Sequence, residues 1–278
     1  MSARRPQQQS RPPPDPIERI PGRVCRGLLW LFTDIDDTLT TGGMLPAHSY
    51  AALWDLHRSG IRVVPVTGRP AGWCDHIARM WPVAGVVGEN GAFAFIYDRE
   101  ERTMRRFHAS GDRERAAARK RLDVLRRRVI SEVPRAAISA DQPYRISDLA
   151  VDFREDVEPL SEEEVRRICA IAREEGAECK VSSIHVNCWY GRFDKVAGVR
   201  LLLDRVAGRT LEELDESVIF VGDSPNDEPM FKAFPLSVGV ANLMRFLGDL
   251  EHLPTYVTTR ECADGFEEAV SIVLSRRG

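Results

Sequence analysis

The sequence predicts an α/β fold: a doubly wound, Rossmann-like parallel-sheet core with an inserted α+β cap domain. Short, continuously apolar runs alternate with amphipathic helical segments near both ends of the chain, which is typical of parallel strands buried on both faces. Several of these runs end in Asp or Thr. The middle of the chain instead carries hairpin-like strands and long charged helices, which favours an insert.

The first half of the core is expected over residues 23–92. The run LLWLF at 28–32 has the continuous apolar character of a buried strand, and Gly60 ends the helix that follows it. This helix and the next elements alternate regularly: helix 46–59, strand 61–68, helix 70–80 and strand 83–87. Such a β-α-β-α-β order predicts parallel strands joined by helical crossovers.

The cap is expected over residues 93–188, and the core resumes over 189–278. The cap begins with two hairpin strands and a basic amphipathic helix over 112–133. Ser161 and Glu164 have the spacing of a capping box, so a second cap helix should begin there. The core pattern then returns with helix 194–206, strand 217–223, short strands within 236–242 and 255–259, and helix 265–274.

Bulk properties exclude several classes of protein. The formal net charge is −3 and no apolar run reaches the length of a membrane span, so neither nucleic acid nor membrane binding is expected. Residues 1–22 are rich in Pro, Gln and Arg and are expected to be a disordered tail. The six cysteines show no C-x-x-C pair, and no signal-peptide core is evident, so we expect free thiols and a cytoplasmic location.

Polar side chains follow three of the predicted core strands, where ligands bind in open α/β sheets. They are joined by Lys195, which opens the helix after the insert. Clustered carboxylates repel one another unless a cation lies among them, and an oxygen-only set favours Mg²⁺. Magnesium beside a carboxylate, a lysine and a hydroxyl suits a phosphoryl group. The strand-end residues are Asp34 and Asp36, then Thr67, then Asp223 with Asn226 and Asp227 close behind.

These motifs resemble the four motifs of the haloacid dehalogenase superfamily. The matching features are D-x-D-x-T at 34–38, Thr67 after an apolar strand, Lys195, and G-D-x-x-N-D at 222–227. The resemblance covers about residues 28–275. The insert lies between the second and third motifs, and GENGAF at 88–93 resembles the core-to-cap crossing of the Cof-type branch with a subfamily IIB cap. That branch includes sugar-phosphate phosphatases.

The resemblance implies a role for each motif residue. Asp34 would be the nucleophile that forms an aspartyl-phosphate, and Asp36 the general acid and later the base. Thr67 would bind a phosphoryl oxygen, and Lys195 would neutralise negative charge. Magnesium would be held by the carboxylates of Asp34 and Asp223 and the backbone carbonyl of Asp36, with Asp227 at the same site orienting either Lys195 or a metal-bound water.

The expected substrate-binding residues extend from the core into the cap. Ser183, His185 and Asn187 alternate along a predicted cap strand, so they share one face, which either reads the substrate's hydroxyls or is a solvated sheet face. Taken alone, the acidic residues could equally be turn residues or helix caps. The full expected set is Thr67, Gly68, Arg69, Asn90, Ser183, His185, Asn187, Lys195 and Asn226.

We therefore expect a Mg²⁺-dependent phosphatase for a small phosphorylated metabolite, with a sugar phosphate as the substrate. Trehalose-phosphate, sucrose-phosphate and mannosyl-phosphoglycerate phosphatases are the nearest types by resemblance. One alternative is a phosphosugar mutase, although its last motif has more glycines than GDSPND. Another is a non-catalytic protein that binds RNA or a phosphorylated partner through the basic helix. The simpler interpretation of that helix is that its charged face is exposed to solvent. The sequence indicates no oligomeric state.

Overall fold

A six-stranded parallel sheet forms the centre of the core. The computed structural model describes residues 12–182 and 184–278. The strand order is β1-β13-β12-β11-β2-β3, and every neighbouring pair is parallel. The predicted α/β core is therefore confirmed. The strands are β1 (Asp15–Pro16), β2 (Trp30–Thr33), β3 (Arg62–Pro65), β11 (Val218–Gly222), β12 (Ser237–Gly239) and β13 (Tyr256–Val257).

Helices cover both faces of this sheet, as a doubly wound fold requires. Successive residues of β2 point to opposite faces: Leu31 joins one apolar cluster, and Trp30 and Phe32 join the other. The first cluster lies under α1 (Gly22–Gly27), α2 (Ala47–Arg58), α3 (Ala71–Met80) and α8 (Cys262–Ser275). The second lies under α6 (Lys195–Ala207) and α7 (Glu228–Ala233).

A hairpin extends the core beside β3. Strands β4 (Val86–Gly88), β5 (Phe93–Asp98) and β6 (Thr103–His108) form an antiparallel sheet, and a parallel bridge joins Val66 to Val87. The sequence analysis assigned residues from 93 onward to the cap. However, Phe93 and Phe95 pack in the core cluster. We keep the division into core and cap as a proposal and move its first boundary from 93 to about residue 110.

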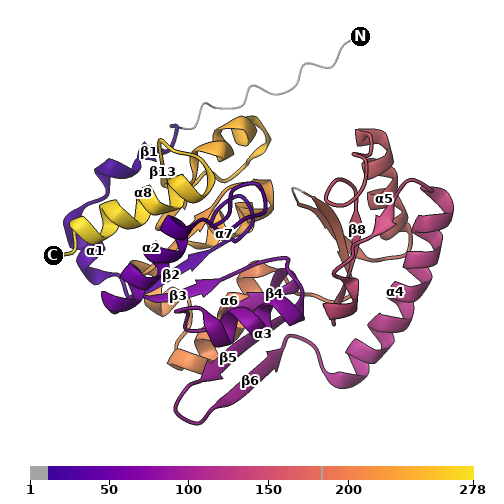
Figure 1. Ribbon diagram of the computed structural model, residues 1–278, viewed down its shortest axis with the longest axis horizontal. Helices are drawn as coiled ribbons and strands as arrows, with labels where there is room; N and C mark the ends of the chain where they lie inside the picture. Colours follow the sequence, from indigo (N-terminus) through magenta and orange to yellow (C-terminus); the bar gives the residue numbers. More distant parts are fainter. Residues whose placement is uncertain (1–11, 183) are drawn as a thin grey trace.

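The inserted unit has its own sheet and apolar core. Its four antiparallel strands lie in the order β7-β8-β10-β9, and one layer of helices packs on them. Figure 1 shows this unit beside the core sheet, with α4 on its outer side. The predicted capping box between Ser161 and Glu164 is present. The elements are α4 (Asp112–Glu132), β7 (Ala137–Ile138), β8 (Asp148–Asp152), α5 (Glu162–Glu174), β9 (Glu178–Val181) and β10 (His185–Trp189).

The predicted disorder of residues 1–22 is wrong for the part next to the core. Residues 1–11 lie outside the described part of the chain. Asp15–Pro16 forms β1 on the edge of the sheet, and Ile17 and Ile20 are fully buried against the first apolar cluster. The Pro-rich composition concealed two isoleucines that bury enough apolar surface to order the segment.

Short 3₁₀ turns complete the chain, at Ile17–Arg19, Glu89–Gly91, Gln142–Tyr144, Glu212–Ser217, Pro225–Asp227 and Ala241–Asp249. All six cysteines are free, and four of them are buried. Within the described ranges, no helix combines the length and apolar character needed to cross a bilayer.

At Gly91, the chain segment that follows β4 comes very close to the start of α6. The φ of Gly91 is +102°, a region that favours glycine. A Cβ at this position would overlap the backbone carbonyl oxygen of Asp194, directly before Lys195. Gly91 therefore lets the segment that follows β4 pass against the first turn of α6, where the predicted active-site lysine lies.

We predict that Gly91→Ala lowers the free energy of unfolding by about 2–5 kcal/mol, because strain at positive φ and overpacking add. Urea denaturation measures this loss. Gly43→Ala is the matched control, because Gly43 also has positive φ (+77°) but nothing lies within 4 Å of the added carbon; its loss should be about 1–2 kcal/mol. Equal losses in the two variants would show that the close approach at Gly91 does not matter.

Candidate active site

The predicted site residues meet at the carboxyl edge of the parallel sheet. β2 lies between β11 and β3, so Asp34 after β2 is flanked by Asp223 after β11 and by Thr67 beyond β3. The backbone amide of Asp34 continues the ladder and donates to the carbonyl of Val221 at 3.0 Å. The register of three neighbouring strands thus sets the spacing of these side chains.

Lys195 lies between two buried carboxylates. Its Nζ is 2.9 Å from Asp34 Oδ2 and 2.7 Å from Asp227 Oδ1, and all three side chains are at most 6% exposed. The side chain of Asp194 caps α6 by accepting a hydrogen bond from the amide of Ala197, so the lysine begins a well-fixed helix. Burial opposes the charged lysine, but the two carboxylates outweigh it and raise the pKa of Lys195.

Asp223 is held by groups from three segments. Its carboxylate accepts hydrogen bonds from Thr38 Oγ1 at 3.4 Å and Asn242 Nδ2 at 3.2 Å. Its own amide donates to Asp227 Oδ2 at 3.0 Å. The sequence analysis missed Asn242, which follows β12 just as the predicted residues follow their strands. Both carboxylate oxygens of Asp227 are thus engaged, by Lys195 and by the amide of Asp223.

The site has more negative than positive charge. One ligand atom each from Asp34, Asp223 and Asp227 lies within 4.8 Å of the others, and all three residues are buried. Burial, only partly offset by Lys195, raises the pKa of Asp34 to about 7. Burial and the neighbouring carboxylates raise the pKa of Asp223 well above its usual value. Three carboxylates facing one ammonium are an oxygen-only set that fits a divalent cation such as Mg²⁺.

Arg69 connects Asp36 to the cap. Its Nη2 and Nε lie 2.8 and 3.0 Å from the carboxylate oxygens of Asp36, and its Nη1 lies 3.1 Å from Glu155 Oε1 in the cap. Glu155 Oε2 is in turn 2.9 Å from His185 Nε2 on β10. The guanidinium also stacks on the ring of Trp73, 4.5 Å from its centre. Arg69 was expected to meet substrate, but its guanidinium is occupied by these carboxylates.

The loop after β3 carries two further predicted residues, Thr67 and Gly68, and the turn after β4 carries a third, Asn90. Thr67 is fully buried, and its Oγ1 accepts a hydrogen bond from the amide of Arg69 at 3.0 Å. Gly68 lies against the side chain of Asn90, only 3.3 Å from where a Cβ would be. Asn90 is 7% exposed, and its Nδ2 has no hydrogen-bond partner among the described residues. This buried free amide therefore faces the hollow of the site with donors to spare.

A narrow hollow lies between the carboxylate cluster and the cap. His185 and Asn187 line it from β10, so the strand face picked out by alternation does look onto the site. Asn187 Nδ2 donates to Asp148 Oδ2 at 3.0 Å. Ser183, the third residue of that predicted face, lies outside the described residues. Asn226 lines the core side, and its Oδ1 lies 3.4 Å from Lys195 Nζ.

Buried charges join the core to the cap, and the sequence analysis missed them. Arg145 pairs with Asp141 at 2.7 Å and Asp148 at 3.0 Å and also donates to the core carbonyl of Gly68 at 2.9 Å. The carboxylate of Glu89 accepts from the amides of Ala71 in the core and of residues 146 and 147 near the cap. Burial raises the pKa of Glu89 to about 8. No local pattern marks their role between the two units, because the groups that they contact in the core or across to the cap lie 18 to 77 residues away.

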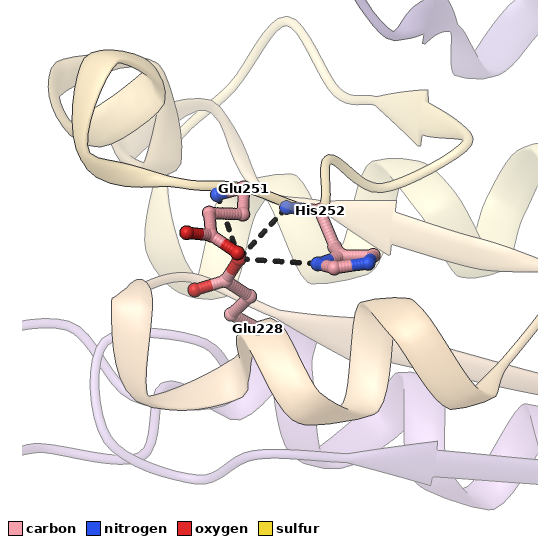
Figure 2. A group of neighbouring side chains, drawn as sticks. All are labelled: Glu228, Glu251 and His252. Atoms are coloured by element: carbon pink, nitrogen blue, oxygen red, sulfur yellow. Dashed lines mark hydrogen bonds and ion pairs between the residues drawn. The ribbon is translucent and has the colours of Figure 1, made fainter.

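A second group of possible metal ligands has a simpler explanation. Glu228, Glu251 and His252 lie close together at the surface (Figure 2). Glu228 Oε1 already accepts hydrogen bonds from the backbone amides of Glu251 at 2.6 Å and His252 at 2.7 Å. Glu228 therefore fixes the loop before β13 to α7, which is a structural role.

Comparison with known proteins agrees with this geometry. Residues 31–118 match the family model of haloacid dehalogenase-like hydrolases. This match confirms, over that part of the chain, the resemblance found in the sequence. No curated protein sequence matches the chain.

Several solved structures share the fold over nearly the whole chain. Protein 0175 of Thermoplasma acidophilum is 17% identical with a TM-score of 0.68, over 89% of this chain and 98% of that one. A trehalose-6-phosphate phosphatase related protein is 18% identical with a TM-score of 0.59, over 88% and 96%. A subclass IIB sugar phosphatase of the superfamily is 16% identical with a TM-score of 0.57, over 87% and 97%. These likenesses establish the fold.

We predict that Glu155→Gln lowers the free energy of unfolding by about 1–2 kcal/mol at pH 7, because it removes a charge shared by His185 and Arg69. The contact with His185 Nε2, 2.9 Å from Glu155 Oε2, and the Arg69 charge hold the pKa of Glu155 at about 2, below its usual 4.5. A depressed pKa contributes stability above pH 4.5 that is lost as the pH falls toward 2.

Urea denaturation between pH 7 and pH 3 tests this sign. The gap between wild type and Glu155→Gln should shrink below about pH 4.5. Glu158→Gln is the control, because Glu158 is exposed on the same loop and should show no gap. A gap that stays constant with pH would contradict the ion-pair account.

Proposed function

We propose that this protein is a haloacid dehalogenase-like hydrolase, a divalent-cation-dependent phosphatase that cleaves a small phosphate ester through a phosphoryl group on Asp34. The observation that supports this most directly is the buried trio of Asp34, Lys195 and Asp227 at the carboxyl edge of the sheet. It offers a carboxylate nucleophile next to an ammonium that favours its ionised form, beside a hydroxyl at Thr67.

Asp34 is suited to attack phosphorus. Lys195 is 2.9 Å from its Oδ2, and the amide of Ile35 donates to its Oδ1 at 2.8 Å, so the orientation of the carboxylate is fixed. Asp34 also lines the hollow that would receive the substrate. In-line attack would break the bond between phosphorus and the leaving oxygen and leave the phosphoryl group on Asp34.

Asp36 is the group that can move the proton. It lines the same hollow, and its side chain is 25% exposed, so a leaving oxygen and then a water can reach it. Arg69 donates hydrogen bonds to the carboxylate of Asp36 from Nε and Nη2, and it donates a third from Nη1 to Glu155 in the cap. Arg69 is therefore a positioning residue that ties the orientation of Asp36 to the position of the cap.

Asp34 and Asp223, with the backbone carbonyl of Asp36, would hold Mg²⁺, and Asp227 would act from the same cluster. When bound, the cation supplies positive charge that offsets the repulsion between the carboxylate and the phosphate. The fit rests on the excess of buried carboxylates over ammonium groups. Thr38 and Asn242 orient Asp223 by hydrogen bonds.

The position of the hollow beneath the cap supports a small metabolite as substrate. Cap residues Lys180, His185 and Asn187 line it opposite the carboxylate cluster, so a bulky substrate would meet the cap. The neighbours include proteins named as sugar phosphatases, which favours a sugar phosphate. Thr67, Gly68 and Asn90 would bind the phosphoryl group, and His185 and Asn187 the leaving group.

The alternative of a binding protein that uses the basic helix gains little support from α4. Arg128 is shared among three glutamates, one of them on α4 and two on or next to α5, and Arg121 stacks on Tyr190 while donating to the carbonyl of Glu175. These arginines fasten α4 to its own unit. The mutase alternative remains testable, because a mutase needs a bisphosphate activator and releases little free phosphate.

We predict that Asp34→Asn lowers phosphate release from sugar phosphates by at least about a thousandfold, because an amide cannot replace the nucleophile. Wild-type activity should require Mg²⁺ and stop with EDTA. A malachite-green assay measures the released phosphate. Asp204→Asn, on the exposed face of α6, should keep full activity. Wild-type activity without a divalent cation, or an active Asp34→Asn, would contradict the mechanism.

We predict that Asp36→Asn affects substrates according to their leaving group. It should lower kcat by about 100- to 10,000-fold for a sugar phosphate, whose leaving alkoxide needs a proton. The loss in the first chemical step should be much smaller for p-nitrophenyl phosphate, whose leaving group is stable without one. Stopped-flow detection of the p-nitrophenolate burst separates this step from dephosphorylation. An equal loss for both substrates in this step would argue against Asp36 as the acid.

A further inference from the structure

The cations around the hollow differ in whether they are paired. Arg69 is neutralised by Asp36 and Glu155, and Lys195 by Asp34 and Asp227. On the cap side, Arg145 is paired with two aspartates and His185 with Glu155. Lys180 also lines the hollow. The ammonium group of Lys180 makes no hydrogen bond or ion pair with any part of the chain that the structure describes.

The strand register explains why Lys180 faces the site. β9 pairs with β10 in antiparallel fashion, and Lys180 lies directly opposite Asn187, so the two side chains share one face of the cap sheet. The adjacent Cys179 points to the other face, where its Sγ lies 3.8 Å from the backbone carbonyl of Cys169 on α5. Lys180 and Asn187 therefore form a neighbouring pair on the wall opposite the carboxylate cluster.

The two groups offer complementary chemistry to the far end of a substrate. Asn187 donates its amide to Asp148, which leaves its Oδ1 free to accept a hydrogen bond. Lys180 offers three donors and a full positive charge. Among the described residues that line the hollow, the other cationic side chains are matched by carboxylates, so Lys180 carries the charge that a ligand can neutralise without breaking a described ion pair.

We propose that Lys180 binds a second anionic group of the substrate, a carboxylate or a second phosphate carried by the leaving group. This rests on the proposed phosphatase function and narrows its substrate class from sugar phosphates in general to phosphate esters of acidic alcohols. On the core side, Lys195 and a bound cation would neutralise the charge of the transferred phosphoryl group. Lys180 binds the anionic group at the other end of the substrate, next to a hydroxyl that can donate a hydrogen bond to Asn187 Oδ1.

Matched pairs of substrates test this proposal. 3-Phosphoglycerate and glycerol 3-phosphate differ in one carboxylate, as do 6-phosphogluconate and glucose 6-phosphate. We expect the wild type to prefer the carboxylate member of at least one pair. Lys180→Met should lower kcat/KM for that member by about 10- to 100-fold and leave the neutral member unchanged, because a hydrogen-bonded charge is lost. Lys180→Arg should retain most of the preference. Lys120→Met, an exposed lysine on α4, is the control.

The possible outcomes separate this proposal from the proposed function. An equal loss on both members of a pair would place Lys180 on the transferred phosphoryl group and overturn the proposal, as would no loss on either. If the wild type hydrolyses p-nitrophenyl phosphate but prefers neutral esters, the phosphatase function stands and the anion site falls. If it hydrolyses nothing, the function falls, and thermal shifts with the same pairs still decide whether Lys180 binds a carboxylate. Equal shifts within each pair, or no shift, would overturn the proposal.

Discussion

The ion pair between Lys195 and the buried carboxylates of Asp34 and Asp227 is the interaction on which the site depends. Carboxylates this deeply buried are costly unless each is paired or hydrogen-bonded. Asp34 and Asp227 share Lys195, and Asp223 relies on Thr38 and Asn242. The remaining negative charge gives the cluster the composition that suits a divalent cation. In the same arrangement Lys195 favours the ionised form of Asp34, which lines the hollow, so the local electrostatics and the proposed chemistry have one origin.

The sequence predicted the centre of the site because the parallel sheet does most of the positioning. A short apolar strand followed by a polar residue places that residue at one edge, and neighbouring strands bring Asp34, Thr67 and Asp223 together. The sequence did not predict Asn242, Arg145 or Glu155, since the contacts that bring them to the site are made with residues 19 to 86 positions away. It also missed the buried Ile17 and Ile20, because proline-rich surroundings suggested a solvated tail.

The cap is bound to the core through charged groups rather than a continuous apolar interface. Arg69 reaches Glu155, Arg145 reaches the carbonyl of Gly68, and Glu89 accepts amides from both sides. These contacts converge on the loop of Thr67 and on Asp36, so a movement of the cap would alter the groups that we propose bind the phosphoryl oxygen and transfer the proton. The cap has its own apolar cluster, and Ile146 of the cap also packs against the first cluster of the core.

The most direct test of the central claim is to trap the phosphoryl group on Asp34. An Asp36→Asn variant lacks the base for the second step, so it should accumulate the covalent intermediate when loaded with p-nitrophenyl phosphate and Mg²⁺. Acid quenching, borohydride reduction and peptide mass spectrometry would then find homoserine at position 34. The account predicts this product in the loaded variant and its absence without substrate or with EDTA. Homoserine at another aspartate, or an unmodified Asp34 during continued turnover, would contradict it.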